Sequence, residues 1–124
     1  SYTGFVYRNA RLSANTLAEG GEVKVCVTVK NSGAVRGAEV VQLYISDETG
    51  APIAGGRVPQ VLRGFSKVWL DPGEERDVEF VLTARDLAHY DPARHAWYAA
   101  PGRYMLRLGH TSRDIRASLG LNFG

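Results

Sequence analysis

Histidine and cysteine are the residue types in this 124-residue sequence that most often hold metals or act as nucleophiles. The three histidines, His89, His95 and His110, have neither the H-x-H nor the H-E-x-x-H spacing of zinc-binding sequences. Cys26 is the only cysteine, so it can form neither an internal disulfide nor a C-x-x-C pair. We therefore predict that the chain binds no metal and no redox cofactor.

Carboxylates are the next candidates, because sugar cleavage and general acid–base chemistry need a pair of them. Asp86, Asp91 and Asp114 lie beside turns, where aspartate commonly bonds its own backbone. Asp47 and Glu48 lack the ligand density of a calcium loop. The G-x-S-x-G motif of serine nucleophiles and the phosphate-binding loop are also absent. The sequence thus predicts no catalytic residue, no cofactor and no enzymatic activity for this chain alone.

Aromatic and arginine side chains are the better candidates, for binding rather than catalysis. Trp69 points outward if its two apolar neighbours point inward, which favours an interface residue over an edge cover or a sugar-stacking platform. Trp97 and Tyr98 are expected to close over the sandwich beside Tyr90. Tyr90 is itself a candidate for a hydrogen bond from its hydroxyl to the backbone at a corner of the fold. For these residues, packing in the core or at a corner is favoured over contact with a ligand. Arg107 alternates with leucines, so it lies on a solvated outer face or, alternatively, docks against a partner domain.

Composition and charge restrict the class of protein. Hydrophobic residues make up 44% and charged residues 23%, as in soluble globular domains, and the length suits one domain over residues 1–124. The net charge of +2 is too small to predict nucleic acid or an anionic membrane as the partner. No apolar stretch approaches the ~20 residues of a membrane span, and the N-terminus lacks the apolar region of a signal peptide.

Alternating apolar residues predict β-strands throughout the chain. The strongest case is residues 22–31, where four valines share one face. In residues 61–70 the inward set is expected to be Leu62, Phe65, Val68 and Leu70, with a bulge near Gly64 where the phase changes. Further period-two segments are residues 39–46, 76–83, 104–108 and 115–123.

Turn signals and one short helix complete the predicted architecture. Residues 71–74 read Asp-Pro-Gly-Glu, which is typical of a type II turn. Residues 83–87 resemble a capping box followed by at most two helical turns. The sequence therefore predicts an all-β, antiparallel β-sandwich of the immunoglobulin or fibronectin type III-like kind, with about seven to eight strands.

Several short motifs in one order carry a family resemblance. They are EVVQLYIS from residue 39, VLRGFSKV from residue 61, LDPGE from residue 70, DLAHYD from residue 86, Trp97, Gly102-Arg103-Tyr104 and GHTSRDIR from residue 109. This series resembles the fibronectin type III-like domain at the C-terminus of many family 3 glycoside hydrolases, the β-glucosidase and β-xylosidase group. The beginning of the chain, SYTGF, resembles the junction that joins this domain to the catalytic part, so we expect a fragment of a larger multidomain glycosidase.

The resemblance implies a function through partner domains. Family 3 enzymes hydrolyse terminal β-linked sugars with an aspartate nucleophile and a glutamate acid/base, which belong to domains upstream of this segment. No catalytic residue is therefore carried over, and the implied partners are the catalytic domains of the parent enzyme. We expect this parent to be secreted or periplasmic. The family often has Arg-Pro followed by a lysine where this sequence reads Arg57-Val58-Pro59-Gln60. Arg57 remains a candidate interface residue.

Three hypotheses follow. The first is a non-catalytic accessory domain that packs on and stabilises a family 3 glycosidase. The second is a carbohydrate-binding module for polymeric substrate, with Trp69 or Trp97 as stacking platforms. The third is a free-standing adhesion or scaffold domain, because sandwich folds commonly serve such roles. The candidate interface or sugar-stacking residues are Trp69, Trp97, Tyr98, Arg57 and Arg107.

Overall fold

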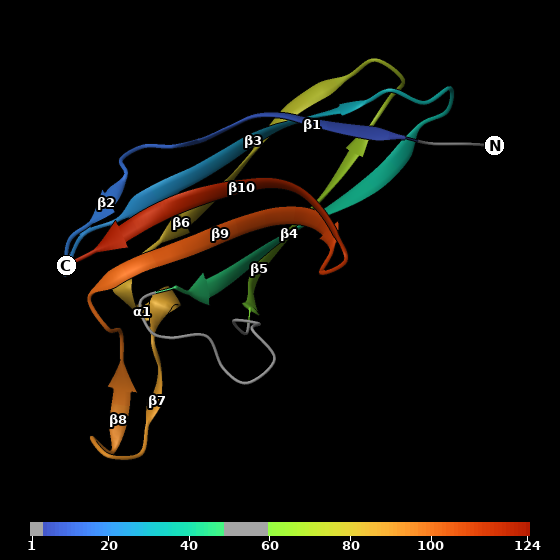
Figure 1. The fold of residues 1–124 in the computed structure, drawn as a ribbon. Coiled ribbons are helices and arrows are strands. Elements are labelled where there is room, and N and C mark those ends of the chain that lie inside the picture. Colours follow the sequence, from blue (N-terminus) through green and yellow to red (C-terminus); the bar gives the residue numbers. More distant parts are fainter. Residues whose placement is uncertain (1–3, 49–59) are drawn as a thin grey trace.

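The computed structural model describes residues 4–48 and 60–124, which form two facing β-sheets and a small hairpin (Figure 1). One sheet has the strand order β1-β3-β6 and the other the order β2-β10-β9-β4-β5, while β7 and β8 pair only with each other. This arrangement confirms the predicted all-β sandwich. The elements are β1 (Phe5–Leu12), β2 (Thr16–Leu17), β3 (Val23–Asn31), β4 (Gly37–Asp47), β5 (Gln60–Leu70), β6 (Glu75–Leu82), α1 (Ala84–Leu87), β7 (His89–Asp91), β8 (Ala96–Tyr98), β9 (Gly102–Thr111) and β10 (Asp114–Phe123).

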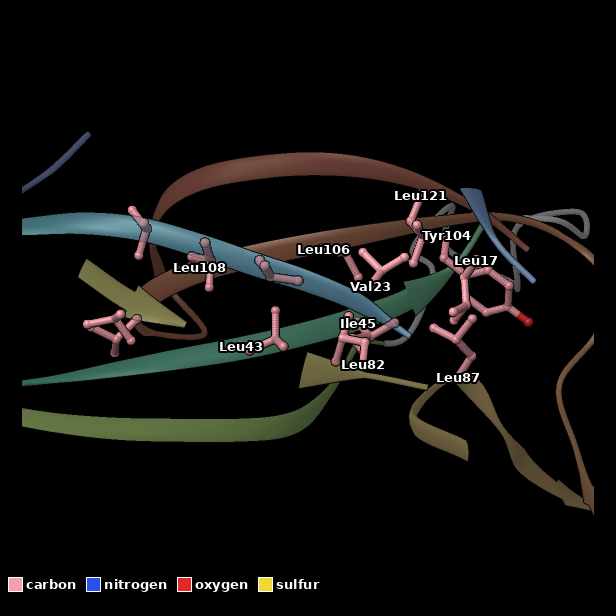
Figure 2. Close-up of a cluster of buried hydrophobic side chains, with 14 of the residues drawn as sticks. Leu17, Val23, Leu43, Ile45, Leu82, Leu87, Tyr104, Leu106, Leu108 and Leu121 are labelled. Carbon is pink, nitrogen blue, oxygen red and sulfur yellow. The ribbon is translucent and has the colours of Figure 1, made fainter. Parts of the chain in front are cut away.

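The core lies between the two sheets and is built by strict alternation of side chains. On β3, Val23, Val25, Val27 and Val29 are at most 1% exposed, whereas the residues between them lie on the outer face. These valines share one core cluster with leucines from β4, β9 and β10, and Figure 2 shows Val23 among the leucines of the opposite sheet. The fully buried side chains that fill this layer include Leu43, Leu106, Leu108, Leu121 and Tyr104.

The predicted bulge is present on β5. Leu43 of β4 pairs with Gly64, but the next residue, Tyr44, pairs with Leu62, so Arg63 is the extra residue. A Cβ atom at Gly64 would lie 3.2 Å from a ring carbon of Phe80 on the opposite sheet. A side chain at this position would therefore press on the Phe80 ring, because the two sheets approach closely at the bulge.

The turn and helix signals of the sequence also hold. Glu74 N donates to the carbonyl oxygen of Asp71 (2.9 Å), and Gly73 has a φ of +81°, as a type II turn requires. Before α1, the backbone N–H of Thr83 donates to Asp86 Oδ2 (2.9 Å), which is the carboxylate half of a capping box. No helix in the described ranges is long and apolar enough to cross a membrane.

Four strands were not predicted from the sequence: β1, β2, β7 and β8. Alternation fails in β1 because Asn9 has a φ of +55° and the pairing with β3 shifts register between Arg8 and Arg11. β2 is only two residues long and forms by parallel pairing with the distant β10. β7 and β8 are three residues each, too short for a period-two pattern to be recognised.

Candidate interaction surface

Trp69 lies on the outer face of the five-stranded sheet, as predicted. Its side chain is 49% exposed, whereas its neighbours Val68 and Leu70 are buried in the core. The guanidinium carbon of Arg36 lies 5.4 Å and the Lys67 Nζ 5.3 Å from the ring centroid. Cations at this distance are attracted to the electron-rich face of an indole ring. Two flanking cations thus hold Trp69 at the surface.

Phe65 was expected to point inward, and this expectation is wrong. Its side chain is 70% exposed and lies on the same outer face as Trp69, opposite Gln42 of β4. Phe65 follows the unbroken alternation of residues 64–70, in which Val68 and Leu70 point inward. The bulge acts on the other side, because the extra residue at Arg63 reverses the inward and outward positions that precede it in β5. Leu62, also expected inward, is 46% exposed and pairs with the outward Tyr44.

Arg107 lies on the outer face as well, on β9, which is separated from β5 by β4. It pairs with Tyr44 of β4, and its Nη1 donates a hydrogen bond of 2.7 Å to the hydroxyl oxygen of Ser46. The Ser46 hydroxyl in turn donates to Glu48 Oε2 at 2.9 Å. The alternation with buried leucines therefore placed Arg107 correctly on the side facing away from the core.

Trp97 and Tyr98 lie on the β7–β8 hairpin, away from Trp69 and Phe65. The prediction that Trp97 packs in the core or a corner is wrong, because its side chain is 68% exposed. Its ring meets the half-exposed Tyr90 edge-on, with centroids 6.0 Å apart. Arg94 stacks 3.7 Å over the Tyr98 ring and is paired with Asp91. The hairpin projects from the sandwich (Figure 1) and stabilises itself by these local contacts.

The corner bond expected of Tyr90 is made by another tyrosine. The buried Tyr104 on β9 donates from its hydroxyl to the carbonyl oxygen of Ala100, four residues upstream, at 2.7 Å. Tyr90 cannot play this part because the hairpin carries it away from the core. The spacing of Tyr104 after the Pro101–Gly102 turn is the sequence signal that points to the correct residue.

An open groove of about 460 Å³ separates the hairpin from the sandwich. Trp97, Tyr98 and Pro101 contribute apolar surface to its lining, together with the C-terminal Phe123. Glu19 and Arg85 are the charged side chains at this groove. An exposed tryptophan beside hydrogen-bonding groups is an arrangement that can bind a sugar ring or a peptide. Arg57, the remaining candidate, falls in residues 49–59 and lies outside the described residues.

A buried carboxylate on β4 was not predicted from the sequence. Glu39 is only 3% exposed; its Oε2 accepts a hydrogen bond from the Tyr7 hydroxyl (2.9 Å), and its Oε1 lies 2.8 Å from His110 Nδ1. Burial, and then Glu39, raise the pKa of Tyr7 because both disfavour the phenolate. Glu39 alternates along β4 with the same spacing as the buried Val41 and Leu43, so it lies on their side of the strand. This spacing is the sequence signal that could have identified it.

Three aspartates with lowered pKa values form surface ion pairs rather than a catalytic site. Hydrogen bonds from Thr28 and Arg94 lower the pKa values of Asp77 and Asp91, respectively, and Arg116 does so for Asp114. In residues 4–48 and 60–124 no group of three or more histidine, cysteine or acidic side chains is arranged to hold a metal ion. The arrangement of these groups favours binding through surfaces over chemistry at a cleft.

Comparison with known proteins identifies the family. The family model described as "Fibronectin type III-like domain" matches residues 39–112, which is more than half of the chain. The chain belongs to this family. The match includes the bulge of β5, the Asp-Pro-Gly-Glu turn and the β7–β8 hairpin. The fibronectin type III-like domain therefore carries both exposed aromatic regions within its matched segment.

The relatives that resemble this fibronectin type III-like domain are β-glucosidases. Beta-glucosidase BoGH3A of Bacteroides ovatus is 37% identical over 123 residues, covering 99% of this chain but 16% of that protein. Thermostable beta-glucosidase B of Acetivibrio thermocellus is 36% identical, covering 93% of this chain and 15% of that protein. The crystal structure of the Listeria innocua β-glucosidase in complex with glucose superimposes with a TM-score of 0.84 at 30% identity, again over 99% of this chain and 16% of that one.

The chain thus spans about 16% of the length of the relatives it matches. The GH3 β-glucosidase of Bifidobacterium adolescentis gives the same result, with a TM-score of 0.82 and 17% of its chain covered. The matched part is the fibronectin type III-like domain, and the catalytic residues of such enzymes lie outside it. The chain is therefore not catalytic by itself, as the sequence predicts.

Proposed function

We propose that this fibronectin type III-like domain packs against the catalytic part of a family 3 glycoside hydrolase of the β-glucosidase type and stabilises it. The observation that carries the proposal is the exposed pair Phe65 and Trp69 on a domain that corresponds to about 16% of its relatives' length. Large aromatic side chains on an outer sheet face lose unfavourable contact with water when a second surface covers them.

Deletion tests this role. When residues 1–124 are removed from the full-length enzyme, the Tm of the remaining catalytic part should fall, and its yield of soluble protein should fall with it. The reason is that the catalytic surface facing the domain becomes exposed to water. An unchanged Tm together with an unchanged yield would reject the stabilising role. Activity of the surviving folded enzyme on a small aryl glucoside serves as the control for an intact active site.

A carbohydrate-binding role is the second candidate, favoured by the 68% exposure of Trp97 at the hairpin groove. Aromatic rings stack on the apolar faces of sugars, and Glu19 and Arg85 would supply hydrogen bonds there. This role predicts that the domain is retained on insoluble cellulose, xylan or chitin and that Trp97→Ala abolishes retention. If the domain is retained on none of the three polymers, the carbohydrate-binding role is rejected.

A further inference from the structure

The two outer faces of the sandwich differ in chemical character. On the three-stranded sheet, the outward residues of β3 and β6 are mostly polar, as expected for an antiparallel sheet with one face in water. Acidic residues of β6 pair there with arginines of β1, Glu75 with Arg8 and Asp77 with Arg11. The charges of these four residues are thus neutralised within the domain itself. The outward residues of β3 and the central part of β6 are Lys24, Cys26, Thr28, Lys30, Asp77, Glu79 and Val81.

The outer face of β4 and β5 has the opposite character. Cross-strand pairs on this face bring Trp69 beside Ala38, Lys67 beside Val40, and Leu62 beside Tyr44. β4 therefore carries apolar side chains on both sides, with Ala38, Val40 and Tyr44 outward, which favours a strand that is covered on both faces. We define the β4–β5 face as these outward residues: Ala38, Val40, Gln42, Tyr44, Leu62, Phe65, Lys67 and Trp69.

The cations at and beside the β4–β5 face are only partly neutralised by carboxylates. Arg36, beside Trp69, pairs with Asp71. Lys67 contacts the Trp69 ring, and within the described part of the chain it has no carboxylate at ion-pair distance. Arg107, next to the face, donates to a serine hydroxyl. An apolar surface bordered by such cations is complementary to an apolar surface that carries carboxylates.

We propose that the β4–β5 face is the surface by which this domain docks on the catalytic part of its glycosidase, and that the docked surface is apolar and presents a carboxylate to Lys67. This inference rests on the proposed function and adds which face docks and what chemistry it meets. A sugar fits this face poorly, because cations already lie over the Trp69 ring and Leu62, Phe65 and Val40 offer no hydrogen bonds to hydroxyl groups. The hydroxyl of Tyr44, also on this face, already donates to Gln42 Oε1.

Carbodiimide crosslinking tests the orientation directly, since it joins an amine to a carboxylate without a spacer. The domain has three lysines, with Lys67 on the β4–β5 face and Lys24 and Lys30 on the opposite face. In the full-length enzyme, mass spectrometry should find Lys67 joined to an aspartate or glutamate outside residues 1–124. A link between Lys30 and its cross-strand neighbour Glu75 is the internal control for the reaction.

Other crosslinking results would overturn the inference. One is Lys24 or Lys30 joined to the catalytic part while Lys67 remains unlinked. Another is the control link formed with no product at Lys67. A third is Lys67 joined to a carboxylate of residues 1–124 from a second enzyme molecule, which would indicate self-association through this face.

A double variant measures the contribution of the apolar surface. Phe65→Thr with Trp69→Thr keeps strand-favouring residues at two outward positions and leaves the core intact. In the full-length enzyme it should lower the Tm of the catalytic part as far as deletion of the domain does. Val81→Thr is the matched control, because Val81 is 47% exposed on the opposite face, and it should leave the Tm unchanged.

The outcomes separate this inference from the proposed function. If deletion lowers the Tm but the double variant does not, the stabilising role stands and the β4–β5 face is the wrong surface. If deletion leaves the Tm unchanged, the stabilising role fails, while the Lys67 crosslink still decides which face docks. Retention on cellulose or xylan that the double variant abolishes would assign the face to polysaccharide and overturn the inference.

Discussion

The hydroxyl of Tyr7 and the carboxylate of Glu39 join the two sheets of the sandwich through a hydrogen bond of 2.9 Å. Tyr7 belongs to β1 of the three-stranded sheet, and Glu39 to β4 of the five-stranded sheet. Arg116 of β10 adds a second connection, because its Nη1 donates to the carbonyl oxygen of Phe5 at 2.8 Å. The first strand is thus fixed to the opposite layer by polar contacts as well as by packing.

Tyr7→Phe should destabilise the domain by about 1–3 kcal/mol, because it leaves Glu39 Oε2 buried without its donor. Urea unfolding followed by circular dichroism measures the loss. Tyr90→Phe is the matched control, since Tyr90 is half-exposed on the hairpin, and its effect should be close to zero. Equal effects of the two substitutions would mean that the Tyr7–Glu39 bond adds nothing to stability.

The free energy of unfolding should fall as the pH rises above 10. Burial and then Asp47 raise the pKa of Tyr104 to about 12 from an ordinary value of 10.0, and the pKa of Tyr7 is raised as well. Because the pKa values of these tyrosines are higher in the folded state, the tyrosines of the unfolded chain ionise first as the pH rises. The stability that they contribute is therefore complete below pH 10 and is lost as the pH rises toward the folded-state pKa values. Urea titrations at several pH values up to 12 should show this decline, with a shallower slope in Tyr7→Phe than in Tyr90→Phe.

Gly109→Ala should be far more damaging than Gly64→Ala. A Cβ at Gly109 would lie 2.3 Å from the carbonyl oxygen of Asp114, so the backbone of β10 would have to move. At Gly64 the contact is 3.2 Å to the Phe80 ring, which is a side chain that can shift slightly. Thermal unfolding of the two variants should give a much lower Tm for Gly109→Ala. Similar Tm values would show that the β9–β10 connection is pliable.

Leu106→Ala should cost about 2–5 kcal/mol, because Leu106 is completely buried between the sheets and the change leaves a cavity. Trp97→Ala should change the stability by no more than about 0.5 kcal/mol, because Trp97 is on the surface of the hairpin. Chemical denaturation of both variants provides the comparison. A large loss in Trp97→Ala would contradict an independent hairpin and point to packing against the sandwich.

Sequence patterns predicted the parts of the fold that depend on local rules. The valines of β3 alternate without interruption, and the Pro72–Gly73 pair selects one type of turn. The strand and the turn could therefore both be predicted from the sequence. β1 could not be read, because Asn9 breaks its alternation with a positive φ. β2 could not be read either, since two residues become a strand only by pairing with β10.

The candidate surface was only partly predictable, for the same physical reasons. Trp69 and Arg107 follow the alternation of their strands, so their outward orientation was correct. Phe65 was misplaced because a change of phase near Gly64 was taken to turn it inward, whereas alternation is unbroken from Gly64 to Leu70 and the register shifts only at Arg63. Glu39 was missed because a carboxylate at an inward position is acceptable only with Tyr7 and His110 as partners, and these come from distant strands.

The extra residue of β5 also affects how the molecule behaves in concentrated solution. β5 is the outermost strand of its sheet, and a straight, apolar outermost strand invites pairing with other molecules. The bulge at Arg63 increases the local twist of this strand and breaks its register between Leu62 and Gly64. A strand added along the whole of β5 would therefore have to bridge this break, which disfavours extension of the sheet at this edge.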